Sequence, residues 1–286
     1  MEKILVTGAL GNVGAEIVKL LQAEGSPVRA ADISTEAIQE RFGADVEAVS
    51  FDFTNPDTYP AALNGVNRMF LMRPPHISNV QRDMIPFLDA AQAAGVEQVV
   101  FLSLIGIEQN QQVPHYKIEQ YLQASSIAFT FLRASFFMQN LSGMHRTEIR
   151  NRDEIFLPVG RGKTSFIDVR DIAAVAVKAL TEPGHENQAY DLTGAEALDY
   201  YQVAEILSEA LGRKIVYCDP SIPAFMWKSL QHGTPLGLIF VMSYLYIQTK
   251  RGMSDTVKDD VKEILGRNPI SLEQFVMDYR QVWEKR

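Results

Sequence analysis

The chain opens with Lys3-Ile4-Leu5-Val6, which runs directly into Thr7-Gly8-Ala9-Leu10-Gly11-Asn12-Val13-Gly14 and then into an amphipathic segment at 12–23. A buried strand, a glycine-rich turn and a helix in this order are typical of a dinucleotide phosphate cradle. Glycine is needed in such a turn because the pyrophosphate approaches the backbone closely, where a Cβ would block it. The first N–H groups of the helix then face the phosphates, and the helix dipole favours their negative charge. The spacing is G-x-x-G-x-x-G rather than G-x-G-x-x-G, and its context predicts cofactor binding.

Two charged residues bear on which dinucleotide is bound. Asp32 ends the second predicted strand, where a carboxylate accepts hydrogen bonds from the ribose hydroxyls of NAD and repels the 2′-phosphate of NADP. Alternatively, Asp32 caps the next helix or lies in a solvated turn. Arg29 precedes the end of the strand, so NADP is disfavoured but not excluded. We therefore expect NAD or NADP, with NAD favoured. The contacts expected from the cradle itself are Thr7, Gly8, Leu10, Gly11, Asn12, Val13 and Gly14.

The composition is that of an ordinary soluble protein and excludes several classes. The chain has 286 residues, of which 47% are hydrophobic, enough for a sizeable core. A formal net charge of -8 without a long basic run argues against nucleic acid as a partner. The single cysteine, Cys218, excludes an intrachain disulfide and fits a cytoplasmic location. The longest apolar run, 236–242, is far shorter than the roughly 20 residues of a membrane span, so no membrane partner is expected.

Apolar, strand-like runs alternate with helical patterns through the first half of the chain. The predicted strands after the first lie at 27–33, 46–51, 68–72, 98–103 and 128–133. The predicted helices lie at 12–23, 35–42, 56–63, 80–94 and 114–124. Strands this apolar, joined by helices, indicate a parallel sheet covered on both faces, and right-handed crossovers make it doubly wound. The predicted class is therefore α/β, with a Rossmann-type sheet.

The pattern changes after residue 134. A helix at 137–150 and an irregular stretch at 157–164 precede a helix at 170–181 and a strand at 189–193. From residue 200 onward the pattern is helical, with one strand at 214–218. We expect a single domain over 1–286, in which 1–134 is the dinucleotide-binding core and 135–286 completes the sheet and adds a small, mostly helical substrate lobe. Because ligands of such folds bind outside the carboxyl ends of the strands, the substrate is expected between these ends and the lobe.

Several residues directly follow predicted strands, at the edge where the cofactor is expected. They are Asp52, Phe53, Met72, Arg73, Pro74 and Ser103. Phe53 is expected near the adenine and is equally compatible with the core. The prolines after Arg73 stiffen a loop near the pyrophosphate and the nicotinamide ribose, where Arg73 either contacts phosphate or is solvated. Ser103 ends the fifth predicted strand, at the level of the sheet edge where the reaction is expected.

The glycine triplet is one of several motifs that the chain shares with a known family. The others are Leu102-Ser103, the run 115–119, and the segments 129–140, 164–173 and 266–269. The most specific, 129–140, reads FTFLRASFFMQN and has Ala134 where close relatives usually have proline. The chain resembles the NmrA-like branch of the atypical short-chain dehydrogenase/reductase superfamily over nearly its whole length. This resemblance implies a Rossmann fold that binds NAD(P). It also implies either a reductase of quinones, dyes, iminium compounds or ethers, or a redox sensor with little turnover.

A catalytic pair that is typical of the family is absent. Carbonyl reduction leaves an alkoxide that needs a proton, and typical members supply it from a Tyr-x-x-x-Lys pair, whose lysine lowers the pKa of the tyrosine. Here Lys117 has Val113 four residues before it. The one match in the chain, Tyr246-x-x-x-Lys250, lies well outside the expected helix. This departure leaves two alternatives: a substrate whose reduced form needs no positioned acid, or no catalysis at all.

Two groups of residues are candidates for the chemistry and the substrate. His115, Tyr116 and Lys117 begin the helix before the sixth strand. Lys117 is a candidate for contact with the nicotinamide ribose or with the substrate, and the alternative is a surface lysine without a role. His115 and Tyr116 are candidates for proton donation, and the alternative for His115 is a histidine at a helix start without a role. The second group follows the sixth strand, where it is expected near the nicotinamide and the substrate or in the core. It consists of Phe136, Phe137 and Asn140.

The lobe contains two runs rich in methionine and aromatic residues, at 225–227 and 236–246. Such runs at helical spacing usually belong to the core. In a lobe over a cofactor they could instead line an adaptable apolar pocket, with Trp227 against a flat hydrophobic substrate. The histidines show no metal-ligand spacing and one cysteine cannot build a zinc site, so no metal is expected.

The sequence therefore predicts an NAD(P)H-dependent reductase of a small hydrophobic acceptor such as a quinone, a dye or an iminium compound. The main alternative is a dinucleotide sensor without catalysis that acts through a regulatory protein partner. A sugar-nucleotide epimerase or dehydratase is a third reading, and the missing Tyr-x-x-x-Lys pair weighs against it. A homodimer is left open.

Overall fold

The computed structural model describes residues 2–285, which form two compact units. The first unit comprises the residues up to Ala134 together with Val169–Leu192 and Glu263–Gly266. The second comprises Ser135–Asp168, Thr193–Lys262 and the residues from Arg267 on. The first segment of the first unit thus ends at the residue where the sequence pattern changes.

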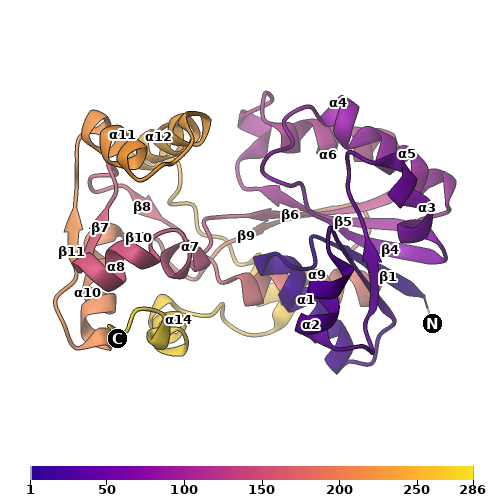
Figure 1. Cartoon of the computed structure of the whole chain (residues 1–286), viewed down its shortest axis with the longest axis horizontal. Coiled ribbons are helices and arrows are strands. Elements are labelled where there is room, and N and C mark those ends of the chain that lie inside the picture. The colour runs from indigo at the N-terminus through magenta and orange to yellow at the C-terminus, as the bar shows by residue number, and fades with distance from the viewer. Residues whose placement is uncertain (1, 286) are drawn as a thin grey trace. The chain divides into compact units, whose positions relative to one another are not determined.

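A seven-stranded sheet forms the centre of the first unit (Figure 1). Its strands are β1 (Lys3–Thr7), β2 (Val28–Asp32), β3 (Glu47–Ser50), β4 (Val66–Leu71), β5 (Gln98–Leu104), β6 (Ala128–Ala134) and β9 (Gln188–Leu192). The order is β3-β2-β1-β4-β5-β6-β9, and every neighbouring pair is parallel. The order reverses between β1 and β4, which is where a doubly wound sheet binds its ligand. The predicted Rossmann-type fold is confirmed.

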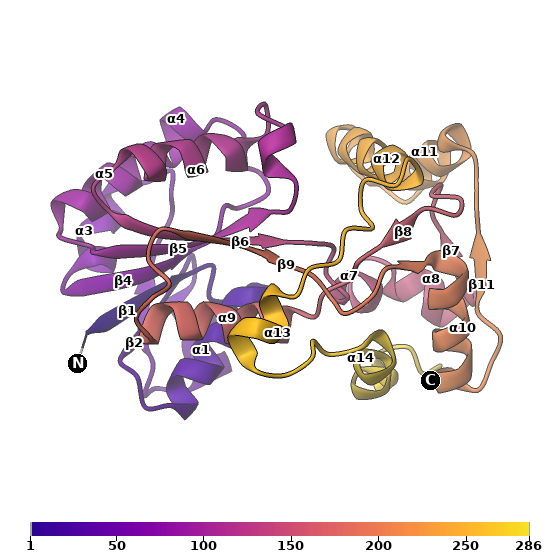
Figure 2. The same cartoon turned by 180° about the vertical axis from the view of Figure 1, so that it is seen from behind.

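Helices cover both faces of this sheet (Figure 2). They are α1 (Asn12–Ala23), α2 (Thr35–Phe42), α3 (Tyr59–Leu63), α4 (Val80–Asp83), α5 (Ile85–Ala93), α6 (Pro114–Ala124) and α9 (Val169–Thr181). In both views α1, α2 and α9 lie on one face and α3 to α6 on the other. A core of buried apolar side chains, centred on Phe51, Phe87 and Phe101, fills the space under the second group. Burial on both faces explains why the inner strands β1, β4, β5 and β6 are largely apolar, whereas the edge strands β3 and β9 are mostly exposed or partly exposed.

Proline accounts for two predicted helices of the first unit that differ from the structure. The predicted helix at 80–94 is divided at Met84 into α4 and α5, because Pro86 in the first turn of α5 has no N–H and its ring excludes the carbonyl one turn earlier. The predicted helix at 56–63 begins as a 3-10 turn at Pro56–Thr58 and continues as α3. The helices predicted at 12–23, 35–42 and 114–124 have the bounds that were expected.

The second unit is mostly helical, as expected. Its helices are α7 (Gln139–Ser142), α8 (Arg146–Arg152), α10 (Tyr200–Leu211), α11 (Ile222–Gln231), α12 (Leu236–Lys250) and α14 (Leu272–Asp278), while α13 (Asp260–Leu265) contains residues of both units. Two short ladders accompany them: β7 (Glu154–Phe156) with β11 (Val216–Cys218), and β8 (Lys163–Thr164) with β10 (Leu198–Asp199). The predicted helix at 137–150 is divided at Gly143, which ends α7.

A separate apolar core holds the second unit together. Trp283 is fully buried in it, and its indole N–H donates to the carbonyl of Leu141 at 3.1 Å. A capping box at Asp199 and Gln202 fixes the start of α10. Within residues 2–285, no helix has both the length and the apolar character needed to cross a bilayer.

Candidate functional site

The turn after β1 is built on three glycines that pack closely. Gly8 has φ of 64°, in the left-handed region, and its carbonyl accepts the N–H of Gly11 at 2.9 Å. A Cβ on Gly14 would overlap the carbonyl oxygen of Gly8, and a Cβ on Gly8 would overlap the methyl group of Met72. The first helical turn of α1 can therefore lie directly against the end of β1 only because these positions are glycine.

The beginning of α1 fits a phosphate group. Gly11 is the N-cap and supplies no side-chain hydrogen bond, and the first turn of α1 contains no acidic residue. The N–H groups of a first helical turn lack partners within the helix itself. Uncapped N–H groups at the positive end of a helix dipole bind anions. The cradle therefore suits the pyrophosphate that the sequence predicts.

Asp32 and Arg41 hold the backbone of Leu10 from opposite sides. The N–H of Leu10 donates to Oδ2 of Asp32 at 3.0 Å, and the N–H of Ile33 donates to Oδ1 at 2.8 Å. Nη1 of Arg41, in the last turn of α2, donates to the carbonyl of Leu10 at 2.8 Å. A carboxylate and an exposed guanidinium thus both lie beside the glycine-rich turn.

Arg41 was missed in the sequence, because its only signal was a basic residue in the helix that follows Asp32. Arg29, which the sequence analysis weighed instead, is 3% exposed and serves the fold. Its guanidinium pairs with Glu47 at 2.6 Å and donates to three backbone carbonyls, those of Ala61, Ala62 and Asn64. Arg41, and not Arg29, is therefore the exposed arginine beside the glycine-rich turn.

Three of the predicted cofactor contacts have evident structural roles. The hydroxyl of Thr7 is fully buried, donates to the carbonyl of Phe70 and accepts the N–H of Met72, each at 3.0 Å, which ties the end of β1 to the end of β4. Asp52 accepts the N–H and the hydroxyl of Thr54 within a turn. Phe53 is buried in an aromatic cluster, 4.6 Å between ring centres from Phe51. Contact of these residues with a cofactor stays a prediction.

The loop after β4 is held by its own arginine. Nη1 of Arg73 donates to the carbonyls of Pro74, Pro75 and Ile77, at 2.8, 3.2 and 2.5 Å. Burial lowers the pKa of Arg73. Its Nε is buried and has no hydrogen-bond partner among the described residues. The guanidinium therefore shapes the loop and keeps one N–H for another acceptor.

His115, at the start of α6, lies near this arginine. Its ring stacks on Phe101 with 5.9 Å between ring centres, and burial, with a smaller contribution from the charge of Arg73, lowers the pKa of His115 to about 3. The imidazole is therefore neutral near pH 7. Its Nδ1 is buried and also has no partner in the described part of the chain. Unpaired buried nitrogens on two neighbouring elements mark a place where a ligand or water supplies the missing hydrogen bonds.

The other two candidates on α6 differ in exposure. Tyr116 is half-buried and Lys117 is exposed. Among residues 2–285, no hydrogen bond or ion pair holds the ammonium group of Lys117, which leaves it available to a ligand. The residue four positions before Lys117 is Val113, which caps the helix without a side-chain hydrogen bond. No tyrosine hydroxyl is supplied at the position that the family motif would use.

Ser103, Glu119 and Arg133 form a buried network at the ends of β5 and β6. The hydroxyl of Ser103, 1% exposed, donates to Oε1 of Glu119 at 2.6 Å. Arg133 donates to both carboxylate oxygens of Glu119, at 3.1 and 2.8 Å, and also pairs with the exposed Glu108. Burial raises the pKa of Glu119 to about 7, with a smaller contribution from the charge of Asp191, and burial also lowers the pKa of Arg133. The hydrogen bond from Ser103 to Glu119 therefore helps to hold α6 in position against the end of β5.

Replacing Glu119 by glutamine tests this network. Glu119→Gln leaves the buried guanidinium of Arg133 without its main counter-charge, and we expect the free energy of unfolding in urea to fall by about 3 kcal/mol. Glu108→Gln is the matched control, because Glu108 pairs with the same arginine but is 59% exposed; it should cost less than about 1 kcal/mol. Equal losses in the two variants would contradict a buried ion pair as the main contact.

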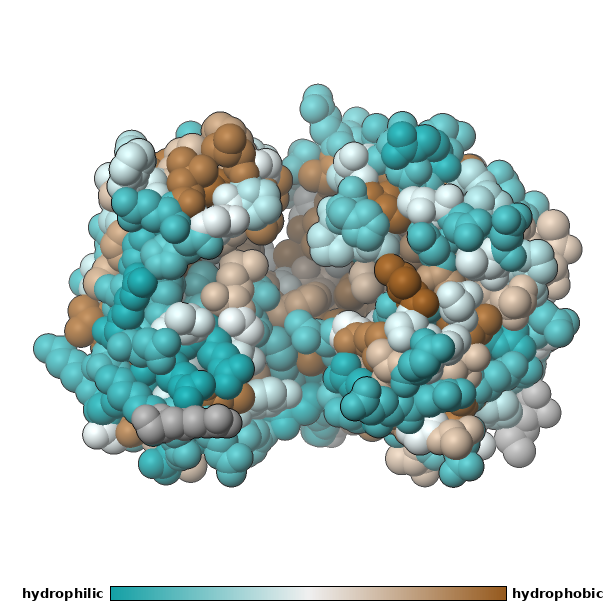
Figure 3. All heavy atoms as spheres, in the orientation of Figure 1, coloured by the Kyte–Doolittle hydropathy of each residue, from teal (hydrophilic) through white to brown (hydrophobic). Residues whose placement is uncertain are grey.

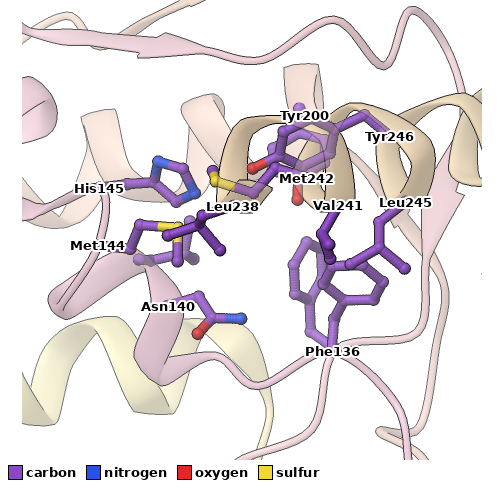
Figure 4. A pocket seen from close by; sticks show the side chains of 12 residues that line it. Phe136, Asn140, Met144, His145, Tyr200, Leu238, Val241, Met242, Leu245 and Tyr246 are labelled. Carbon is purple, nitrogen blue, oxygen red and sulfur yellow. The ribbon is translucent and has the colours of Figure 1, made fainter. Parts of the chain in front are cut away.

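The second unit contains an apolar cavity of about 150 Å³. Figure 4 shows its walls, which come from the segment after β6, from α10 and from α12. The lining residues are Phe136, Asn140, Leu141, Met144, His145, Phe166, Tyr200, Leu238, Val241, Met242, Leu245 and Tyr246. The amide of Asn140 points into the space between the apolar side chains. The other polar groups of the lining belong to His145, Tyr200 and Tyr246. Methionine and aromatic side chains around a few polar groups make an adaptable site for a flat apolar ligand.

The cavity contains two of the four predicted substrate residues. Phe136 and Asn140 line it. Phe137 is half-buried, and its backbone forms a bridge to Ile167, so its side chain is not among the lining residues. Trp227 is 66% exposed and is not a lining residue either. Within the described residues, no cluster of potential metal ligands is found.

Comparisons with known proteins agree with this architecture. The family model described as "NmrA-like family" matches residues 1–275, and the chain belongs to that family. A "NAD(P)H azoreductase" of Xenophilus azovorans is 37% identical over 276 residues, which cover 95% of this chain and 96% of that protein. The "Uncharacterized oxidoreductase YesF" of Bacillus subtilis is 32% identical and covers 98% of this chain and 96% of its own length.

Solved structures show the same fold. The triphenylmethane reductase of Citrobacter sp., complexed with NADP(H), has a TM-score of 0.85 at 24% identity over 97% of this chain and 99% of its own. The NADPH-dependent quinone oxidoreductase QOR2 of Escherichia coli has a TM-score of 0.87 at 22% identity over 96% and 99% of the two chains. Family and relatives together place the chain among the oxidoreductases.

The cradle can be tested by adding one methyl group. Gly14→Ala forces the first turn of α1 away from the carbonyl of Gly8, and we expect NADH to bind at least about tenfold more weakly in isothermal titration. Gly25→Ala is the control, because nothing lies within 4 Å of its added Cβ, while its φ of 70° makes alanine unfavourable there. It should lose some stability and keep its affinity for NADH. An unchanged affinity in Gly14→Ala would contradict the assignment.

Proposed function

We propose that the chain is an NAD(P)H-dependent reductase that transfers hydride to a small hydrophobic acceptor of the quinone, dye or iminium class. The observation that carries the proposal is the apolar cavity of the second unit, in which methionine and aromatic side chains surround the single amide of Asn140. The relatives named as azoreductase, triphenylmethane reductase and quinone oxidoreductase act on acceptors of this kind. When bound, the nicotinamide supplies the hydride.

The cavity volume limits which part of the acceptor is bound. A cavity of about 150 Å³ holds one six-membered aromatic ring, since an apolar cavity of this size accommodates benzene. We therefore expect Phe136 and Met242 to pack against one ring of the acceptor, while the remainder of a larger dye lies outside the cavity. Tight packing on a single ring orients the acceptor, and orientation supplies much of the rate of a hydride transfer that needs no covalent step.

The residues of α6 supply no conventional acid. Neither a Tyr-x-x-x-Lys pair nor a protonated histidine is available near pH 7, because Val113 stands in the tyrosine position and His115 is neutral. An iminium ion or a cationic dye becomes neutral on accepting hydride and needs no proton. A quinone becomes a hydroquinone anion, which the ammonium of Lys117 can stabilise until water protonates it. In this proposal His115, Tyr116 and Lys117 therefore act by hydrogen bonding and charge.

Turnover tests the proposed function directly. We expect NADH or NADPH to be consumed with at least one class in a panel of quinones, cationic dyes and cyclic iminium compounds. Binding of both cofactors would be measured on the same sample by isothermal titration. Tight cofactor binding without turnover across the whole panel would favour a sensor that acts through a protein partner. Absence of cofactor binding would contradict both readings.

Truncation in the cavity tests where the acceptor binds. Phe136→Ala removes one wall, and we expect KM for the acceptor to rise about tenfold, the loss of roughly 1.4 kcal/mol of ring contact, with an unchanged Kd for NADH. Trp227→Ala is the matched control, because this aromatic residue belongs to the same unit but does not line the cavity. A larger KM effect in Trp227→Ala than in Phe136→Ala would place the acceptor elsewhere.

We also propose that both cofactors are accepted, with Asp32 supporting NADH and Arg41 supporting NADPH. The carboxylate retains lone pairs for ribose hydroxyls after accepting the N–H groups of Leu10 and Ile33. The guanidinium of Arg41 is exposed beside the same turn and can pair with a 2′-phosphate.

Single substitutions separate these two roles. Arg41→Ala should weaken NADPH binding about tenfold, since a charge-assisted contact contributes roughly 1.5 kcal/mol, and change NADH binding less than about twofold. Asp32→Ala should weaken NADH binding by a similar factor. Isothermal titration of both cofactors against each variant is the measurement. Equal weakening of NADH and NADPH in Arg41→Ala would mean that the arginine only holds the carbonyl of Leu10.

A further inference from the structure

One surface of the second unit is unusually apolar. It consists of the exposed side chains of α11 and α12, and we call it the α11–α12 face. Its members are Trp227, Leu230, Leu236, Leu238, Phe240, Val241, Tyr244 and Leu245. Figure 3 shows hydrophobic side chains gathered over α12 on the face of the molecule seen there. Contiguous exposed apolar surface of this kind marks an interaction site.

The core of the second unit does not explain this surface. Ile239 and Tyr246 of α12 are buried in that core. On the outer side Leu236, Phe240 and Tyr244 are 56%, 60% and 49% exposed. A helix that packs by one face carries polar residues on the other, whereas α12 reads LGLIFVMSYLYIQTK and is apolar all round until its last turn. Helices of this composition are normally covered by protein or lipid.

The charged side chains of α11 and α12 themselves have one sign. The chain has 35 acidic residues among 286, yet none lies between Asp219 and Asp255, a stretch that includes all of α11 and α12. Of its basic residues, Lys228 is already paired with Glu154 at 2.7 Å. Lys250 and Arg251 are exposed at the end of α12. The surface is thus apolar with a positive margin, on a chain whose net charge is -8.

We infer that the α11–α12 face binds the surface of an anionic lipid bilayer. Apolar and aromatic side chains enter the boundary between headgroups and acyl chains, and tryptophan and tyrosine are favoured there. Lys250 and Arg251 then meet the phosphate groups, while no carboxylate of the face is repelled. The contact is peripheral: α12 has 15 residues, fewer than a span needs. It departs from the expectation that the chain has no membrane partner, and agrees with the finding that no helix among residues 2–285 can cross a bilayer.

A second copy of the chain fits the same face less well. In a two-fold dimer the same patch meets itself, and neither α11 nor α12 contains an acidic side chain that could pair with Lys250 and Arg251 of the other copy. An anionic surface pairs with the margin at every point. The charge pattern therefore favours lipid, and self-association is an outcome that the experiment must detect.

The apolar cavity shares side chains with the α11–α12 face, and this suggests what membrane binding would do for the protein. Leu238, Val241 and Leu245 are exposed on the face and also line the cavity. An apolar acceptor dissolved in the bilayer could pass between these side chains without crossing water. This last step rests on the proposed function, whereas binding of the face to lipid does not.

The test uses the full chain and vesicles of phosphatidylcholine, with or without a third of phosphatidylglycerol. We expect co-sedimentation with the anionic vesicles, weakened by salt, and a blue shift of tryptophan fluorescence. The shift reports on Trp227, which is 66% exposed, because Trp283 is fully buried. Absence of binding to anionic vesicles would overturn the inference, whatever the activity with soluble acceptors.

Variants locate the contact. The double variant Phe240→Ser, Tyr244→Ser should bind anionic vesicles at least about tenfold more weakly, because it removes two aromatic side chains from the face. Met277→Ser on α14, 55% exposed, is the matched control and should bind like the wild type. Near-ultraviolet circular dichroism checks the fold of each variant. Equal binding by all three proteins would overturn the inference. The inference would also be overturned if the wild type bound no lipid and sedimentation equilibrium showed that it forms a dimer which the double variant does not form.

Discussion

The close contact between Gly14 and the carbonyl of Gly8 is the constraint on which the cofactor site depends. It lets the first turn of α1 begin directly at the end of β1, with its N–H groups uncapped. The turn is then tied on both sides: Thr7 connects it to β4, and Leu10 is held by Asp32 at the end of β2. A cradle fixed to three neighbouring strands is organised before ligand binds, so little ordering entropy is lost on binding.

Local signals explain how much of the fold could be predicted from the sequence. The helices at 35–42 and 114–124 were predicted to the residue because Ser34 caps one and Pro114 begins the other, and both signals lie within a few residues of the boundary. The strands of the large sheet were recognisable as buried apolar runs. By contrast, β8 and β10 have two residues each, too few for any periodicity, and they exist because tertiary contacts bring the segments together.

The candidate site likewise contains residues that could be predicted from the sequence and residues that could not. The glycines and Asp32 could be predicted because the phosphate cradle is formed by neighbouring residues in the chain. Arg41 and the pairing of Glu119 with Arg133 could not, since each depends on which side chains the sheet brings together. The cavity is an intermediate case: Phe136 and Asn140 were expected from their place after β6, but their partners on α12 come from a segment about a hundred residues later in the chain.

The contacts of the charged side chains near the strand ends limit which groups are available to an acceptor. Nη1 of Arg73 is hydrogen-bonded to its own loop while Nε keeps an N–H for another acceptor, Arg133 is paired with Glu119 and Glu108, and His115 is neutral. Lys117 is the exposed cation on α6 that no contact among residues 2–285 engages. A site with donors available on Lys117 and Arg73 and no positioned acid suits the proposed acceptors, which take up hydride first and a proton later, or none at all. Under the proposed function, ketones are poor acceptors because their alkoxide products need a proton in the same step, and the missing tyrosine therefore narrows the proposed acceptor class.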